Sequence, residues 1–293
     1  MLSRRNFIKT SAALATLSVL PIGLSSCNNK EKDKAIGVQL WTVNQELNRD
    51  FEATIRTVVQ IGYKRLEGYG YSEGLFFGRT PRELNKFLEA LGARMTSTHT
   101  DIPWNEGNAD WNYCRKAMAD AAELGCKWLI QPYYQINREL GIDGVKRLAD
   151  HYNQCGEIAK ANGLKFGYHN LTMEFDELEG EIPYEVLLNY TDKELVSYQI
   201  DTVQLVTAGY VCHEYVQRFP GRFGTWHIKD TPAGRKGNSC DLGKGVVDFE
   251  GIFNYAEVAG MEDFYVEQED FDRDRLDCLQ YDYDFLMNAP YVK

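Results

Sequence analysis

The sequence of 293 residues predicts a single α/β domain that folds as a closed (β/α)8 barrel after an N-terminal signal segment. Three observations lead to this fold class. Short apolar runs alternate eight times with longer amphipathic segments, no linker rich in Pro, Gly or Ser divides residues 35–293, and polar side chains gather at the ends of the apolar runs. Such alternation implies parallel strands joined by helices, and eight units at this length fit one TIM barrel.

The first half of the barrel should contain four strands and the helices between them. The strands are expected at 35–43, 63–67, 93–98 and 128–132, and the helices at 51–61, 80–91 and 110–124. Gly62, Gly92 and Gly125 follow these helices, as glycine often does at a helix C-terminus. Thr80 and Glu83 form a capping-box pattern at the start of the second helix.

The second half continues in the same way. Its strands are expected at 164–170, 194–201, 224–228 and 263–267, and its helices at 143–162, 184–189, 206–219, 249–259 and 273–286. The main alternative is an open, doubly wound sheet. That fold usually carries a G-x-G-x-x-G turn after its first strand, and this sequence has none, so the closed barrel is favoured.

The N-terminus predicts export. SRRNFIK resembles a twin-arginine signal, and the uncharged stretch 10–26 is short for a membrane span. The letters LSSC end this stretch like a lipobox, with Cys27 as the lipid-bearing residue. We therefore expect a signal peptide over 1–26, a tether over 27–34 and a periplasmic or cell-surface lipoprotein. The alternative is a buried N-terminal helix that has a pair of arginines by chance.

Charge and cysteine usage exclude some classes of function. The net charge of −11 becomes −14 without residues 1–26, so a nucleic-acid partner is not expected. The six cysteines beyond Cys27 form no C-x-x-C pair, which argues against a structural zinc site. We interpret most of them as core residues.

Ionisable and polar side chains stand at the predicted ends of the strands. In chain order they are Trp41, Glu67, His99, Gln131, His169, Asp201, His227 with Lys229, and Glu267. Polar residues often end strands, and this is the simple explanation for any one of them. A barrel, however, brings the carboxyl ends of all its strands to one rim, where active sites form.

Three of these residues predict a metal site. Asp201, His227 and Glu267 make a mixed nitrogen and oxygen set that suits Mn, Zn, Co, Mg or Fe as a divalent ion. The fourth ligand should come from the fifth strand, as His169 or Glu174. We favour Glu174, because three carboxylates and one histidine balance a divalent charge. The alternative for His227 is a core histidine bonded to a backbone carbonyl.

Five segments carry a resemblance to a known family: FGYHNLTMEF (166–175), YQIDTVQLVTAG (198–209), RFPGRFGTWHIKD (218–230), LGKGVVDFEGIF (242–253) and FYVEQED (264–270). The chain resembles the xylose isomerase-like TIM barrels, the sugar phosphate isomerases and epimerases. The resemblance implies Glu174, Asp201, His227 and Glu267 as metal ligands. One departure is that His169 stands on the fifth strand where ketose epimerases carry a glutamate.

The resemblance also implies the chemistry. We expect a metal-dependent isomerase or epimerase that acts through an enediolate on an unphosphorylated sugar or keto-sugar, because no phosphate loop or basic cluster is evident. The alternatives are a lyase or hydrolase on 3-keto-glycosides and a non-catalytic carbohydrate-binding protein. The expected catalytic residues are Glu174, Glu267, His169 and Lys229. The expected substrate-binding residues are Trp41, Glu67, His99, His169, Trp226 and Lys229, although Trp41 and Trp226 could equally be barrel packing.

Overall fold

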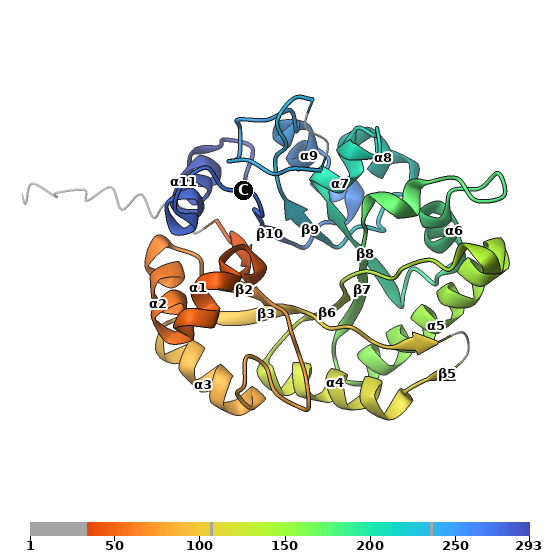
Figure 1. The fold of residues 1–293 in the computed structure, drawn as a ribbon, viewed down its shortest axis with the longest axis horizontal. Coiled ribbons are helices and arrows are strands. Elements are labelled where there is room, and N and C mark those ends of the chain that lie inside the picture. The colour runs from red at the N-terminus through yellow and green to blue at the C-terminus, as the bar shows by residue number, and fades with distance from the viewer. Residues whose placement is uncertain (1–33, 106–107, 235–236) are drawn as a thin grey trace, which may run out of the picture. The chain divides into compact units, whose positions relative to one another are not determined.

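The computed structural model describes residues 34–105, 108–234 and 237–293. Within them, eight parallel strands close into a barrel in the order β1-β10-β9-β8-β7-β6-β3-β2 (Figure 1). The strands are β1 (Gly37–Gln39), β2 (Arg65–Gly68), β3 (Arg94–His99), β6 (Trp128–Gln131), β7 (Lys165–His169), β8 (Val196–Asp201), β9 (Thr225–Ile228) and β10 (Asp263–Val266). The predicted (β/α)8 barrel is therefore confirmed. The expected signal peptide and almost all of the tether lie outside the described residues.

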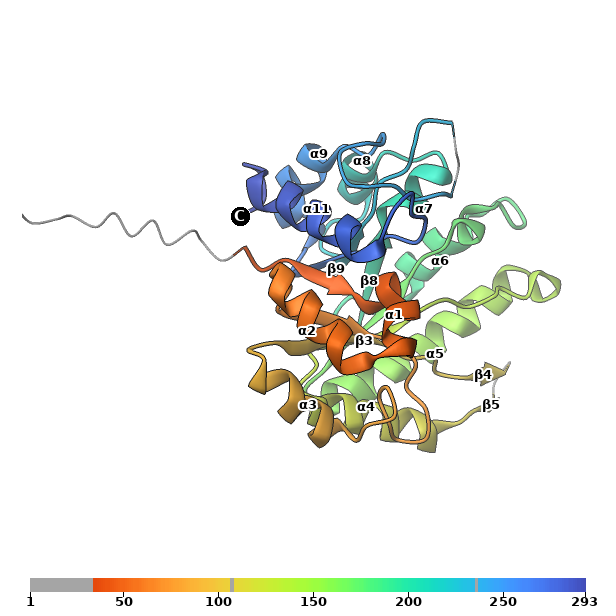
Figure 2. The same ribbon diagram turned by 60° about the vertical axis from the view of Figure 1, so that its left-hand side comes forward.

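Helices surround the barrel, as the turned view shows (Figure 2). They are α1 (Asn44–Arg49), α2 (Phe51–Ile61), α3 (Pro81–Ala90), α4 (Trp111–Leu124), α5 (Gly141–Ala161), α6 (Pro183–Tyr190), α7 (Thr202–Thr207), α8 (Cys212–Arg218), α9 (Phe249–Asn254), α10 (Ala256–Ala259) and α11 (Arg275–Asn288). Short 3-10 helices η1 (Leu40–Val43), η2 (Arg138–Leu140) and η3 (Thr172–Phe175) lie in the loops. None of the described helices is long and apolar enough to span a bilayer.

Side chains at the helix starts explain why the helices begin where they do. Asp50, Asp110 and Asp248 each accept a hydrogen bond from a backbone N–H in the first turn that follows. Thr80 and Glu83 form the predicted capping box of α3. These bonds satisfy backbone donors that have no partner inside the helix.

Two predicted elements are divided in the structure. The strand expected at 35–43 ends at Gln39, because the Gln39 side chain accepts a hydrogen bond from the Trp41 N–H and turns the chain into η1. The helix expected at 206–219 is instead two helices, α7 and α8. Helix α7 starts early because Asp201 caps it, and it ends before Gly209, which has a φ of 94°. The helix expected at 249–259 likewise divides at Tyr255.

A hairpin was not predicted. Strands β4 (Trp104–Asn105) and β5 (Asn108–Ala109) pair antiparallel outside the barrel, after β3. Two residues per strand are too few to leave a periodic pattern in the sequence.

Asp263 ties the strand starts together at the bottom of the barrel. It is 2% exposed and pairs with Arg65 of β2, while its Oδ2 accepts hydrogen bonds from Lys127 Nζ (2.6 Å) and Trp128 Nε1 (2.8 Å). Trp128 belongs to β6, which stands opposite β10 in the ring of strands. One carboxylate thus spans the closed end of the barrel and leaves the carboxyl ends of the strands as the open end.

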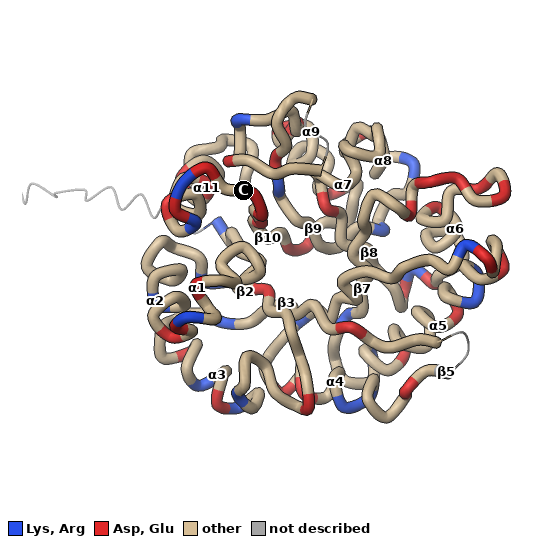
Figure 3. Tube along the Cα trace, viewed as in Figure 1, with Lys and Arg blue, Asp and Glu red and all other residues tan. Residues whose placement is uncertain are grey.

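Charged residues of both signs are interspersed over the outer helices (Figure 3). Several form pairs between neighbouring helices, such as Arg82 of α3 with Glu123 of α4 and Arg218 of α8 with Glu185 of α6. Exposed pairs of this kind contribute little to stability, typically less than about 1 kcal/mol. The ionisable groups at the barrel mouth differ from these pairs because they are buried.

Candidate functional site

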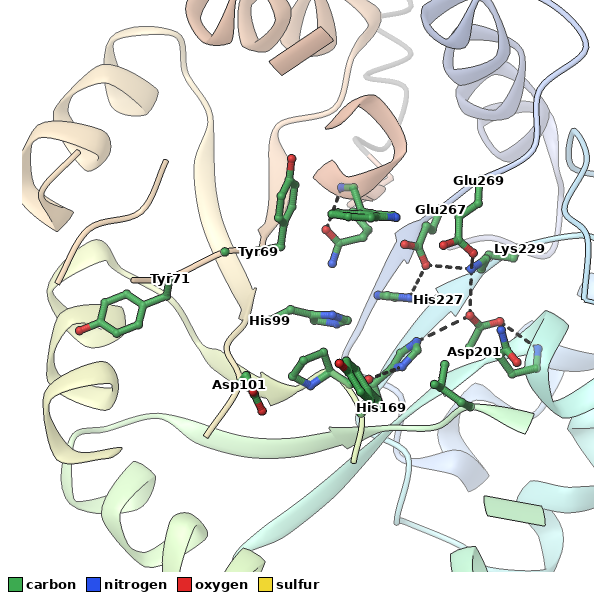
Figure 4. A pocket seen from close by; sticks show the side chains of 17 residues that line it. Tyr69, Tyr71, His99, Asp101, His169, Asp201, His227, Lys229, Glu267 and Glu269 are labelled. Atoms are coloured by element: carbon green, nitrogen blue, oxygen red, sulfur yellow. Dashed lines mark hydrogen bonds and ion pairs between the residues drawn. The ribbon is translucent and has the colours of Figure 1, made fainter. Parts of the chain in front are cut away.

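A cavity of about 500 Å³ opens at the carboxyl ends of the strands (Figure 4). Seven of the residues predicted to form the site line it: Trp41, His99, His169, Asp201, His227, Lys229 and Glu267. Three others, Glu67, Glu174 and Trp226, do not. The volume lies in the range of small-molecule sites, so the cavity can enclose a ligand.

Four side chains meet at the floor of this cavity. His169, Asp201, His227 and Glu267 each offer one ligand atom, and the four atoms lie within 4.8 Å of one another. His169 Nε2 lies 3.6 Å from Asp201 Oδ2, and His227 Nδ1 lies 2.7 Å from Glu267 Oε2. His169 Nε2, Asp201 Oδ2 and His227 Nδ1 are buried and lack a well-aligned hydrogen bond. Because nitrogen and oxygen ligand atoms converge here from four different segments, the arrangement fits a bound divalent cation.

Each histidine has a hydrogen-bond acceptor behind it. Pro132 O lies 2.9 Å from His169 Nδ1, and a carbonyl can only accept, so this nitrogen carries a proton. Glu67 Oε1 lies 2.5 Å from His227 Nε2. Burial acts to lower the pKa of His227, but Glu267 and Glu67 outweigh it and raise the pKa to about 10, so an ion would take the place of the proton on His227 Nδ1. Acceptors behind metal-binding histidines orient the ring. His169 Nε2 and His227 Nδ1 belong to the group of four.

The two carboxylate oxygens of Asp201 have different roles. Its Oδ1 accepts hydrogen bonds from the Val203 and Gln204 N–H groups at the start of α7, at 2.9 and 3.1 Å. Its Oδ2 is left for the cavity floor. Burial would raise the pKa of Asp201, but Lys229 and His169 lower it to about 2. Asp201 is therefore ionised at neutral pH and offers Oδ2 to the floor of the cavity.

Lys229 is the cation beside these carboxylates. It is 2% exposed, and its Nζ lies 3.0 Å from Asp201 Oδ2, 3.1 Å from Glu267 Oε2 and 2.6 Å from Glu269 Oε2. Burial acts to lower the pKa of Lys229, but the carboxylates outweigh it and the pKa is raised. Lys229 and His227 hold the pKa of Glu267 well below its usual range against the effect of burial. The floor is thus a dense, ionised cluster.

Glu174, the favoured fourth ligand, does not join this cluster among the described residues. Its Oε1 accepts a hydrogen bond from the Tyr168 hydroxyl at 2.5 Å, and its Oε2 accepts one from the Leu171 N–H at 2.9 Å. Burial raises the pKa of Glu174 to about 7. The geometry therefore favours His169 over Glu174 as the contribution of β7. Glu174 lies two residues inside η3, where its carboxylate supports the turn after the strand.

Glu67 lies behind the floor, not in it. It is fully buried and accepts hydrogen bonds from Gln39 Nε2, Ser97 Oγ and Gln199 Nε2, in addition to its contact with His227. Burial raises its pKa, but His99 and His227 lower it to about 2. Glu67 is placed to position His227, so the prediction that it touches substrate lacks support from the cavity lining.

Trp226 is also placed away from the cavity. Its side chain is fully buried, and its Nε1–H donates to Phe223 O at 3.1 Å. It alternates with His227 along β9, so the two side chains point to opposite faces of the strand. Trp226 is therefore barrel packing, the alternative that the sequence left open.

His99 shares the wall of the cavity with His227. Their rings stack with centroids 5.1 Å apart, and His99 Nε2 lies 2.6 Å from Gln199 Oε1. Gln199 already donates from its Nε2 to Glu67, so its oxygen faces His99 and the His99 Nε2 carries a proton. Burial is the main reason why the pKa of His99 is lowered to about 4, and the ring is neutral at pH 7.

Asp230, the last residue of HIKD, anchors a loop. Its carboxylate accepts hydrogen bonds from the Gly243, Gly245 and Val247 N–H groups at 2.8 to 3.0 Å. The three ionisable residues at the end of β9 thus have different roles. His227 and Lys229 face the floor, and Asp230 holds the loop above it.

Sequence reasoning missed several residues of the cavity and its support. These are Gln39, Asp101, Tyr133, Gln199 and Glu269. The two-residue period of a strand was a signal for one of them, since Gln199 shares a face of β8 with Asp201. Asp101, Tyr133 and Glu269 lie in loops, where no periodicity points inward.

Comparison with known proteins agrees with this architecture. Residues 50–288 match the family described as "Xylose isomerase-like TIM barrel". Inosose dehydratase from Clostridium beijerinckii is 27% identical over 252 residues, covering 76% of this chain and 83% of that protein. The inosose dehydratases from Clostridium perfringens are also 27% identical, but over 152 residues, and the match spans only 50% of their length.

Solved structures give the same picture. A sugar phosphate isomerase/epimerase from Parabacteroides distasonis is 30% identical, with a TM-score of 0.76, and covers 89% of this chain and 100% of that one. A second such protein from the same organism is 27% identical, with a TM-score of 0.78, covering 89% and 96%. A zinc-bound IolI protein shares the fold at 14% identity and a TM-score of 0.66, covering 88% and 98%.

Proposed function

The chain belongs to the xylose isomerase-like TIM barrel family, and on that premise we propose that it is a metal-dependent sugar isomerase or epimerase. The observation that carries the proposal is the convergence of ligand atoms from His169, Asp201, His227 and Glu267 at the floor of the cavity. The substrate that we propose is an unphosphorylated sugar or keto-sugar. Lys229, the only lysine or arginine lining the cavity among the described residues, is already paired with three carboxylates.

A divalent ion fits the floor, with His169, Asp201, His227 and Glu267 as the residues that would hold it. Two imidazole nitrogens and two carboxylates suit Mn, Zn, Co, Mg or Fe, and the two carboxylates balance the charge of a divalent ion. When bound, such an ion acts as a Lewis acid that polarises a substrate carbonyl and favours its enediolate.

The side chains around the floor supply the remaining chemistry. Glu267 is ionised and faces the cavity, so it can take the proton from the carbon beside a substrate carbonyl. The Lys229 ammonium is paired with three carboxylates, and its positive charge stabilises negative charge that develops on a nearby substrate oxygen. His99, which is neutral, binds a substrate hydroxyl. Epimerisation follows when a second donor, such as a water molecule, protonates the opposite face of the enediolate and Glu267 passes its proton to solvent.

Elimination is the second candidate. The same enediolate can expel a substituent from the next carbon, which makes the protein a lyase, and a 3-keto-glycoside would lose its aglycone in this way. The inosose dehydratases to which the chain is similar favour this candidate by their name. A carbohydrate-binding protein without catalysis is a third candidate on the same scaffold.

Metal content and isotope exchange test the proposal together. We expect about one Mn, Zn, Co, Mg or Fe ion per chain, and solvent deuterium incorporated at a single carbon of ketoses or keto-glycosides. Asp201→Asn should abolish both. Asp277→Asn, which changes an exposed carboxylate on α11, is the matched control and should change neither. A metal-free protein that binds sugars without exchange would instead be a carbohydrate-binding protein.

We also propose that the protein is exported by the twin-arginine route and carries a lipid on Cys27. The support is the order of the SRRNFIK pattern, the uncharged stretch 10–26 and the LSSC sequence. Labelling of the expressed protein with a radioactive fatty acid, lost in Cys27→Ser, is the expected result. Export without labelling would contradict the lipid anchor.

A further inference from the structure

The outer part of the cavity differs from its floor. The floor is polar and ionised, whereas the wall toward solvent is lined by Trp41, Tyr69, Tyr71, Pro132, Tyr133 and Leu171. Trp41 is 45% exposed and Tyr133 is 55% exposed. Large aromatic side chains exposed at the mouth of a cavity commonly mark a surface that a ligand covers.

The two exposed rings lie on well-separated sides of the mouth. Trp41 lies in η1, directly after β1, and Tyr133 follows β6. In the ring of strands, β2 and β3 stand between β1 and β6. A ligand that rises from the floor therefore has an aromatic surface on both sides as it leaves the cavity.

Trp41 is a supported platform. Its ring meets the edge of Tyr69 with centroids 5.1 Å apart, and Tyr69 in turn meets Phe77 at 5.1 Å. Nearly half of the Trp41 side chain nevertheless remains open to solvent. A ring that neighbours hold in place loses little conformational entropy when a ligand packs on its open surface.

The charges at the mouth argue against a phosphate group. Among described residues lining the cavity, Lys229 is the only lysine or arginine, and it lies at the floor against Asp201, Glu267 and Glu269. Asp101 adds a further carboxylate to the lining. Phosphate recognition uses arginine and lysine, whereas carboxylates accept hydrogen bonds from hydroxyl groups.

We propose that the substrate is an uncharged keto-glycoside with two rings: a sugar that carries a carbonyl at the polar floor and a second ring packed between Trp41 and Tyr133. The flat C–H face of a sugar, or an aromatic aglycone, packs on such side chains, and its hydroxyls bond to Asp101 at the rim. The cavity of about 500 Å³ joins both regions. This inference rests on the proposed function and names the class of its substrate.

The test compares ligands that differ only in the second ring. The probes are methyl 3-keto-β-D-glucopyranoside and its phenyl analogue, with 3-keto-glucose 6-phosphate as a charged probe, and calorimetry measures their dissociation constants on the metal-loaded protein. We expect the phenyl compound to bind about tenfold more tightly than the methyl compound. The phosphate should bind no more tightly than the methyl compound.

Variants locate the effect. Trp41→Ala and Tyr133→Ala should each weaken binding of the phenyl compound about tenfold and affect the methyl compound much less. Tyr190→Ala is the matched control, because Tyr190 is 52% exposed but lies on α6 and does not line the cavity. Thermal melting checks that all three variants fold. Equal binding of the two glycosides, equal weakening of both by Trp41→Ala, or tighter binding of the phosphate each overturns the inference.

Deuterium exchange separates this inference from the proposed function. If deuterium enters the methyl compound but the phenyl compound binds no more tightly, the proposed enzyme is supported and the second-ring subsite is contradicted. If the phenyl compound binds more tightly but no deuterium enters, the subsite is supported and the proposed isomerase is contradicted.

Discussion

At the scale of single residues, the most informative choice is the ligand from β7. His169 Nε2 is buried and lies 3.6 Å from Asp201 Oδ2, whereas both oxygens of Glu174 already accept hydrogen bonds. We therefore predict that His169→Ala lowers metal affinity by at least about 100-fold, because a ligand matters more than the groups behind it. Glu174→Gln should keep about one metal ion per chain. Titration with a competing chelator measures both, and the reverse order would restore Glu174 as the ligand.

The sequence could predict that Asp201, His227 and Glu267 meet at one rim, because Asp201 and His227 are the last inward residues of β8 and β9 and Glu267 directly follows β10. It could not decide between His169 and Glu174. Both stand near the end of β7, and the deciding facts are contacts with distant residues: Pro132 O at His169 Nδ1 and the Tyr168 hydroxyl at Glu174. Charge balance, which favoured Glu174, did not take into account that Lys229 would lie beside the same carboxylates.

The buried carboxyl group of Asp282 should make the free energy of unfolding depend on pH. It is fully buried in α11, and burial raises its pKa to about 8. The folded protein keeps this proton, and the unfolded chain releases it above about pH 4, so stability falls as pH rises from about 4 to 8. Asp282→Asn should remove this loss, and its advantage over wild type should grow by up to roughly 3.5 kcal/mol between pH 5 and pH 8. Urea unfolding at both pH values measures it.

Asp284→Asn is the control for this prediction. Asp284 is an exposed carboxylate on the same helix, where its Oδ1 accepts a hydrogen bond from Gln280. Its stability relative to wild type should stay nearly constant with pH. An advantage of Asp282→Asn that does not change between pH 5 and pH 8 would contradict the assignment of a proton to Asp282.

At the scale of elements, the start of α3 is the most local piece of the fold. Thr80 Oγ1 accepts from the Glu83 N–H, and the Glu83 carboxylate accepts from the Thr80 N–H. Thr80→Ala should lower the free energy of unfolding by about 1 kcal/mol, since it leaves a backbone donor unsatisfied. Thr57→Ala, inside α2, should be neutral or slightly stabilising, because alanine is the better helix former. Equal losses in urea unfolding would contradict a capping role.

Elements with local signals were predicted well, and elements set by distant contacts were not. The helix expected at 51–61 has the bounds of α2, because Asp50 and Gly62 mark both of its ends. Helix α7 was missed, since it begins at the carboxylate that serves the cavity. The site residue Asp201 therefore also determines a helix boundary, and its signal as an N-cap was overlooked because it was interpreted only as the end of a strand.

At the scale of the whole molecule, the barrel divides its polar groups between two ends. The open end gathers ionised side chains for a ligand, whereas the closed end uses Asp263 to join β2, β6 and β10. Alternation predicted the ring of strands from local patterns alone. The carboxylate that joins opposite strands could not be predicted, because an aspartate before an apolar run is ordinary in a sequence.

Asp263→Asn tests this closure. The change keeps the shape of the side chain but removes a buried charge from Arg65 and Lys127, and such losses cost roughly 3 kcal/mol. Glu262→Gln is the matched control, because Glu262 pairs with Lys127 and Lys165 at a partly exposed position and should cost less than about 1 kcal/mol. Urea unfolding compares the two at equal ionic strength. Because Asp263 is 2% exposed, salt should change the effect of Asp263→Asn on stability much less than that of Glu262→Gln. Similar losses of stability in the two variants would show that closure does not depend on the Asp263 carboxylate.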